Sequence, residues 1–352
     1  MAADESSELN ELASLLNKGR SPSMRQERRT QQDHYLKTEV PSRAKILSMP
    51  VAEAVKALEE HASVPRVVEA VCGRWSALGY APLRRQSAAE AGALPAIVAG
   101  MRAHPSVSMV QEAACMALAN ICSGTDEDGL ARKKLAAEAG VLPALVAAMI
   151  EHLSVSGVQY GGSAAIGNIC AMGTASAADE AGLARKAAAA EAGVISAIVA
   201  GMRAHPTSSE VQEKGAFAIG NIARSVGKAG LEQLGGEFEK GLERKRLVAE
   251  EGGIGALVAA MKEHSRHSGV QEWGARALSI ITYEMPSLRE AALAAGARAQ
   301  WLCGMAELME GLRAHASPSK GRAAFTGLTG RNMAAFLAPQ GRLPQSSRVA
   351  AR

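Results

Sequence analysis

Aromatic residues are scarce in this chain, whose 352 residues include only four Phe, four Tyr and three Trp. A large single core usually contains more aromatic mass, because these side chains bury the most area per residue. A large charge of one sign is also lacking, since the formal net charge is only +4. So small a charge does not predict nucleic-acid or membrane binding. The composition therefore argues against one large compact core, and the net charge gives no indication of a basic surface that binds nucleic acid or a membrane.

Long hydrophobic runs are missing as well. The longest, Ala139 to Ile150, has 12 residues, whereas a membrane-spanning helix needs about 20. We therefore expect no membrane span. The opening MAADESSELNE is acidic and polar, so no secretory signal is expected. The five cysteines are odd in number and form no CxxC pair, which predicts buried free thiols and a cytoplasmic or nuclear location: Cys72, Cys115, Cys122, Cys170 and Cys303.

Enzyme motifs are absent too. The sequence contains no GxxxxGK[ST], no HExxH and no GxSxG between a strand and a helix. Hydrophobic alternation that would predict strands to carry such a motif is also missing. We therefore expect no catalytic residues, no cofactor and no metal.

An internal repeat dominates the chain. Four segments share one pattern: 88–122, 136–170, 189–223 and 248–282. The first three begin AAEAG and continue through a hydrophobic stretch to V-Q and N-I, whereas the fourth begins VAEEG and has I-I in place of N-I. Degenerate copies lie at 51–78 and 305–329. The extra length between copies always falls between the end of one and the start of the next. Repeats of this size indicate an array of stacked units.

Each copy predicts three helices. The second is the clearest, because Leu94, Ile97, Val98 and Met101 follow helical spacing and form one apolar stripe. A short first helix is expected to end at a glycine, which can adopt the left-handed conformation of a sharp corner: Gly92, Gly140, Gly193 and Gly252. Such helices cannot bury their apolar faces alone, so the repeats must stack on one another.

The pattern resembles the armadillo repeat family. Glu90–Ala91–Gly92, the stretch Leu94–Pro95–Ala96–Ile97–Val98, and Val110–Gln111–Glu112 followed by Ala117–Leu118–Ala119–Asn120–Ile121 carry the resemblance. It implies an all-α, right-handed solenoid of about six three-helix repeats over residues 49–330. Tails at 1–48 and 331–352 are expected to be disordered, the first partly helical. A helical array of the HEAT kind is the alternative, but the glycine corner favours armadillo repeats.

Three polar columns recur with the repeat. The first is histidine, at the end of each second helix: His61, His104, His152, His205, His264 and His315. Equivalent positions are a whole repeat apart, at intervals of 43, 48, 53, 59 and 51 residues. They therefore cannot converge on one metal ion, which needs three or four ligands. We expect these histidines to bond the free carbonyls at the helix ends.

The second column is basic: Arg84, Arg132, Arg185 and Arg244. Stacked along one edge of an array, these arginines could hold acidic segments or phosphate. Acidic residues precede them in each connecting segment, which favours local charge pairing on a solvated edge.

The third column is asparagine: Asn120, Asn168 and Asn221. Each lies two residues past a core Leu or Ile, roughly 200° round the third helix, and is expected to face solvent. The armadillo resemblance implies that it lines a concave groove and holds the backbone of an extended peptide. By helical spacing, further residues share this face: Met116, Tyr160, Phe217, Trp273 and Arg276. Packing between repeats is the alternative role for Phe217 and Trp273.

The sequence therefore predicts a monomeric scaffold or adaptor that binds a protein partner through an extended peptide segment. Tyr, Trp and Arg dominate binding hot spots, which supports this groove. We expect no nucleic-acid partner. The alternatives are a nucleic-acid or acidic-lipid-associated factor that uses the basic edge, and a regulatory repeat module of a larger assembly.

Overall fold

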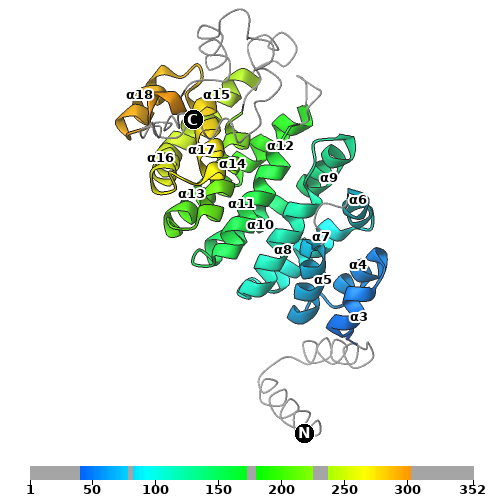
Figure 1. The fold of residues 1–352 in the computed structure, drawn as a ribbon. Helices are drawn as coiled ribbons and strands as arrows, with labels where there is room; N and C mark the ends of the chain where they lie inside the picture. Colours follow the sequence, from blue (N-terminus) through cyan, green and yellow to red (C-terminus); the bar gives the residue numbers. More distant parts are fainter. Residues whose placement is uncertain (1–39, 78–81, 173–179, 225–236, 303–352) are drawn as a thin grey trace, which may run out of the picture.

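The computed structural model describes residues 40–77, 82–172, 180–224 and 237–302. These residues form 16 α-helices and one short 3-10 helix, and no strand occurs among them. The helices follow one another in chain order from α3 to α18 (Figure 1). The all-helical prediction is confirmed, and the helices pack as a repeat.

Three helices make up each complete repeat, and the described residues contain four of these, from α6 to α17. The first helices are α6 (Pro82–Glu90), α9 (Glu127–Glu138), α12 (Glu180–Glu191), α15 (Glu237–Glu250) and α18 (Pro286–Ala294). The second helices are α4 (Val51–Glu60), α7 (Ala93–Ala103), α10 (Val141–Glu151), α13 (Val194–Ala204) and α16 (Gly253–Glu263). The third helices are α5 (Pro65–Ala77), α8 (Ser108–Ile121), α11 (Ser156–Cys170), α14 (Ser209–Ala223) and α17 (Ser268–Thr282).

Glycine makes the corner between the first and second helices, as predicted. The φ angles of Gly92, Gly140, Gly193 and Gly252 are 86°, 71°, 75° and 79°. An L-residue with a side chain is strained in this left-handed region. Gly296, with a φ of 89°, follows α18 in the same way. Helix α18 is therefore placed as the first helix of a further repeat, which the sequence pattern had placed only at 305–329.

A continuous hydrophobic core runs through all the repeats. It begins at Ile46 and continues to Leu302. The predicted stripe of the second helix is buried, with Leu94, Ile97 and Met101 each no more than 3% exposed. Neighbouring third helices pack directly on one another in the order α5, α8, α11, α14 and α17. This row of third helices places equivalent side chains of successive repeats beside one another.

The N-terminal end of the array differs from the sequence prediction. Helix α3 (Arg43–Ser48) belongs to the stretch assigned to the N-terminal tail, yet Ile46 is buried in the common core. The folded part therefore begins before residue 49. Residues 1–39, the copy at 305–329 with His315, and the tail at 331–352 lie outside the described residues.

No single described helix is long and apolar enough to cross a membrane. Helices α12 and α13 meet the length and composition criteria only when taken together, and they are bent by 64° at the break between them.

Candidate functional site

The asparagines of the third helices connect neighbouring repeats. The Nδ2 atom of Asn120 donates to the Ser76 carbonyl at 2.7 Å. Asn168 and Asn221 donate to the carbonyls of Ala119 and Gly167 at 2.8 and 3.0 Å. All three side chains are half-buried. The expectation that they simply face solvent is therefore wrong, because the third helix of the preceding repeat covers part of each amide.

The same hydrogen bonds fix the orientation of each amide. A backbone carbonyl can only accept, so the NH₂ group must face it and the amide oxygen must point elsewhere. The oxygens of Asn168 and Asn221 make no hydrogen bond within the part of the chain that the structure describes. Each amide also has a second N–H group. Asn168 and Asn221 can therefore each join two repeats and still offer an acceptor and a donor to a partner.

Two aromatic side chains lie beside these amides. Phe217 and Trp273 meet edge to face, with ring centroids 4.7 Å apart. The Arg276 guanidinium lies over the Trp273 ring at 5.2 Å. Phe217 also lies against Gly167, where a Cβ atom would overlap its ring. Both aromatics are only half-buried, so they pack between repeats and also present ring surface to a ligand.

A pocket of about 350 Å³ unites these residues. Helices α11, α14 and α17 supply five residues predicted for the groove: Asn168, Asn221, Phe217, Trp273 and Arg276. The other residues that line it were not predicted as groove residues: Gly124, Thr125, Lys133, Ala171, Met172 and Arg224. The pocket therefore combines amides, aromatic rings and cations from three repeats.

The charge in this pocket has one sign. Lys133, Arg224 and Arg276 line it, and no carboxylate of the described residues does. The Lys133 ammonium donates to the Ala171 carbonyl at 3.1 Å. Burial lowers the pKa of Arg224, and the nearby positive charge of Arg276 lowers it further. The electrostatic environment of this pocket favours an anion.

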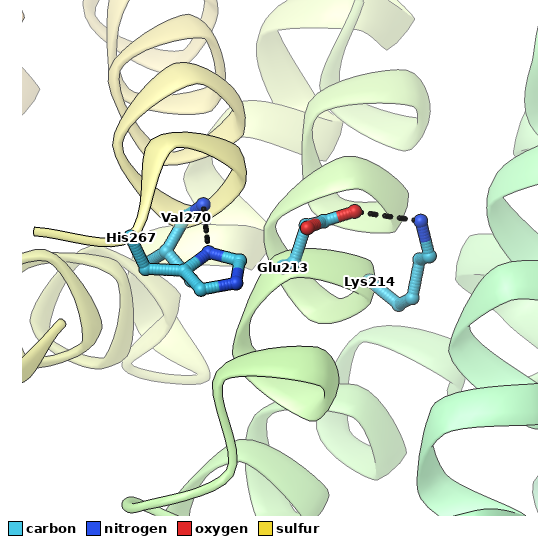
Figure 2. A network of polar contacts seen from close by, with 4 residues as sticks. All are labelled: Glu213, Lys214, His267 and Val270. Atoms are coloured by element: carbon cyan, nitrogen blue, oxygen red, sulfur yellow. Dashed lines mark hydrogen bonds and ion pairs between the residues drawn. The ribbon is translucent and has the colours of Figure 1, made fainter. Parts of the chain in front are cut away.

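The other predicted groove residues lie outside this pocket. Asn120 and Met116 are on α8, at an earlier step of the third-helix row. Tyr160 is on α11, with the Lys214 ammonium 6.0 Å from the centre of its ring. Lys214 pairs with Glu213 at 2.7 Å (Figure 2). The predicted face is therefore not one uniform groove, because only part of it forms the pocket.

Helix α17 begins opposite Glu213. His267 precedes the helix and its Nδ1 atom accepts from the Val270 N–H at 3.3 Å, so the side chain caps the first turn (Figure 2). The Glu213 carboxylate lies against Gly269, where a Cβ atom would overlap it. Glu213 thus meets the positive end of the helix dipole and also neutralises Lys214.

The predicted basic edge is wrong. Arg132, Arg185 and Arg244 are only 2%, 4% and 4% exposed. Their Nε atoms donate to carbonyls at the end of the preceding third helix: those of Ile121, Ile169 and Ile222, at 2.8, 2.9 and 3.2 Å. Four carbonyls at each helix end lack a partner within the helix. The arginines therefore cap helices and do not form an exposed phosphate-binding edge.

The lysine that follows each of these arginines caps a second helix end. Lys133, Lys186 and Lys245 donate to the carbonyls of Ala171, Arg224 and Tyr283, at the end of the third helix of their own repeat. The ends of α11 and α14 are therefore each held by two first helices. Arg84 differs from the other members of the column, because it is exposed on α6.

The histidine column also connects repeats. The described histidines follow directly after the second helices, as predicted. However, the Nε2 atoms of His104, His152 and His205 bond to carbonyls of the preceding repeat, at 2.9, 2.6 and 2.8 Å. His264 does the same with Pro206 at 2.8 Å. The expectation that they cap their own helices is wrong, because the turn of the preceding repeat lies within reach.

A recurring glutamine, which was not among the predicted site residues, caps the second helix. It is the Gln of each V-Q phrase: Gln111, Gln159, Gln212 and Gln271. Each is buried and donates to two carbonyls at the end of the second helix. Its recurrence after Val at the start of every well-formed third helix was the available signal.

Titratable groups do not gather into a metal site among the described residues, where no group of three or more His, Cys, Asp or Glu could hold an ion. The four described cysteines are buried free thiols, as predicted. Burial raises the pKa of the Cys115, Cys122 and Cys170 thiols to about 12, 12 and 11. Thiols with such raised pKa values are poor nucleophiles and poor metal ligands.

Comparison with known proteins gives a fold but no family. The class that the fold defines is an all-helical protein whose helices pack as a repeat. One similar solved structure is a crystal structure described as that of an engineered protein, with a TM-score of 0.55 and 23% identity. The match covers 82% of this chain and 95% of that chain. No protein-family model and no curated protein matches the sequence.

Proposed function

We propose that the chain is a right-handed, armadillo-type solenoid that acts as a protein-binding scaffold, without catalytic activity or a cofactor. Its partner would bind as an extended peptide across the third helices α11, α14 and α17. The observation that carries this proposal is the pocket that combines the free amide oxygens of Asn168 and Asn221 with the ring surfaces of Phe217 and Trp273. The alternative of a phosphate-binding edge has lost its support, because Arg132, Arg185 and Arg244 are buried helix caps.

Two kinds of contact would hold the peptide. An amide oxygen accepts from a backbone N–H and the free N–H of the same amide donates to a backbone carbonyl, whatever the peptide sequence. Each such hydrogen bond contributes about 0.5–1.5 kcal/mol. Packed helices lie about 8–10 Å apart, and an extended chain rises about 3.3 Å per residue. A peptide of about six residues would therefore reach from α11 to α17.

The chain supplies a matched pair of variants for the test. Asn221→Ala removes one hydrogen bond between repeats. Asn120→Ala removes the bond to Ser76 and a longer one of 3.4 Å to Trp75, but only Asn221 lines the pocket. Both variants should lose about 0.5–1.5 kcal/mol of unfolding free energy. Hexapeptides selected on the intact chain from a random library should bind Asn221→Ala about 2- to 10-fold more weakly per lost hydrogen bond. They should bind Asn120→Ala unchanged.

Fluorescence anisotropy of the labelled hexapeptides measures this difference. If the selected peptides bind both variants as tightly as the intact chain, the pocket is not their binding site and the proposal is wrong. If no hexapeptide binds the intact chain, the peptide-binding role itself is contradicted.

A further inference from the structure

Two arginines in the pocket have no anionic partner among the residues that the structure describes. Arg224 follows the end of α14 and Arg276 lies on α17, and both are half-buried. Within the described residues neither guanidinium has a carboxylate within 4.0 Å. By contrast, Lys214 on the same third-helix row pairs with Glu213. The fold therefore neutralises a cation outside the pocket and leaves two cations in it unneutralised.

Such an arrangement has an electrostatic cost. Removing a charged group from water is unfavourable unless an opposite charge or hydrogen bonds replace the water. Two like charges in one pocket add repulsion, and the lowered pKa of Arg224 reflects both effects. The Trp273 ring offsets part of this cost for Arg276 by a cation–π contact. An anion between the two guanidinium groups would remove the rest.

We propose that this pocket is the subsite for an acidic residue of the bound peptide. This inference rests on the proposed function and names the chemistry of the partner. The carboxylate of an Asp or Glu would lie between Arg224 and Arg276, whose guanidinium groups can each donate two hydrogen bonds to it. Asn168 and Asn221 would hold the backbone on either side, and the Trp273 ring would pack against the next side chain.

Tryptophan emission reports occupancy of the pocket directly. Of the three tryptophans, Trp75 and Trp301 are 1% and 2% exposed, whereas Trp273 is half-buried and lines the pocket. A peptide that enters the pocket should therefore change the emission of Trp273 alone. The signal should be absent in Trp273→Phe, which keeps an aromatic ring at this position.

The experiment compares peptides and variants in pairs. Hexapeptides selected on the intact full-length chain should contain an Asp or Glu at a fixed position, and each is synthesised again with Gln or Asn in its place. The neutral peptide should bind about 10- to 100-fold more weakly, as expected for lost hydrogen bonds between charged groups. Arg224→Gln and Arg276→Gln should each weaken binding of the acidic peptide by a similar factor. The difference in affinity between the acidic and the neutral peptide should be smaller in these variants than in the intact chain. Arg276→Lys should bind more tightly than Arg276→Gln but less tightly than the intact chain, because lysine keeps the positive charge and lacks the paired N–H groups of the guanidinium.

Arg266→Gln is the matched control. Arg266 is exposed in the turn before α17, outside the pocket, and its replacement removes the same charge. It should leave the affinity unchanged. If peptides change Trp273 emission but the neutral versions bind equally well, the acidic subsite is wrong and the peptide groove stands. If no peptide changes Trp273 emission, the groove and the subsite are both wrong.

Discussion

Replacing Gln212 by Met tests whether the glutamine caps stabilise the repeat. Gln212 is 2% exposed, and its Nε2 atom donates to the carbonyls of Met202 and His205 at 2.8 Å each. A methionine side chain has a similar shape but cannot donate a hydrogen bond. Gln212→Met therefore removes both bonds with little change in packing volume.

Losing the glutamine hydrogen bond costs different amounts of free energy at the two carbonyls. The helix partner of the Met202 carbonyl would be the N–H four residues later, but Pro206 occupies that position and has none. This buried acceptor is left without a partner, which costs about 1–3 kcal/mol. The His205 carbonyl keeps a bond from the Ser208 N–H at 3.2 Å, so its loss is about 0.5–1 kcal/mol. Together Gln212→Met should lower the free energy of unfolding by about 1.5–4 kcal/mol.

Thermal unfolding followed by far-ultraviolet circular dichroism measures the effect. In a folded unit of this size about 1 kcal/mol corresponds to about 2–4 °C, so Tm should fall by roughly 3–15 °C. Glu210→Met is the control, because Glu210 is exposed two residues earlier on α14 and receives the same side chain. Its effect should stay below about 1 kcal/mol. If Gln212→Met shifts Tm no more than Glu210→Met does, the glutamine caps contribute nothing measurable.

Two further predictions concern other buried groups. Lys186→Met removes the bond to the Arg224 carbonyl and should lower the free energy of unfolding by about 1–3 kcal/mol. The control Lys134→Met, on the exposed face of α9, should lower it by less than about 0.5 kcal/mol. Equal losses in the two variants would contradict a capping role for Lys186. Cys115 and Cys170 should resist thiol labelling in the native protein, because burial raises their pKa values to about 12 and 11. Since an unfolded thiol titrates near pH 8.5, their contribution to stability is present below about pH 8.5 and is lost as pH rises towards 11, so Tm should fall over this interval. Rapid labelling at neutral pH would contradict the burial of these thiols.

Local patterns in the sequence predicted the helices well. The stripe of Leu94, Ile97 and Met101 follows the helical period, and a residue such as Gly92 marks a corner because few others adopt its φ angle. These features depend on neighbouring residues along the chain. The second and third helices from α7 to α17 therefore followed from spacing, and the ends of the first helices followed from the glycines.

Contacts between repeats were harder to predict. Helical spacing placed Asn168 away from the core stripe, but it could not show that the end of α8 lies on that side and accepts its N–H. Charge suggested that Arg132 was on the surface, whereas its long side chain reaches the carbonyls at a buried helix end. Arg224 lines the pocket but was not predicted as a groove residue. It lies three residues after Asn221, so helical spacing could have placed it on the same face.

The paired arginine and lysine in each first helix affect how the chain can change in length. The lysine bonds within its own repeat and the arginine bonds to the one before. The donors therefore match at the boundaries that α9, α12 and α15 form with the preceding repeats. Joining Lys133 directly to Ala187 would delete one repeat. Lys133 would then face the carbonyl of Arg224, and Asn221 would face that of Ala119, so each donor would still meet an equivalent acceptor. Recombination between like positions can therefore add or remove whole repeats without leaving a helix end uncapped.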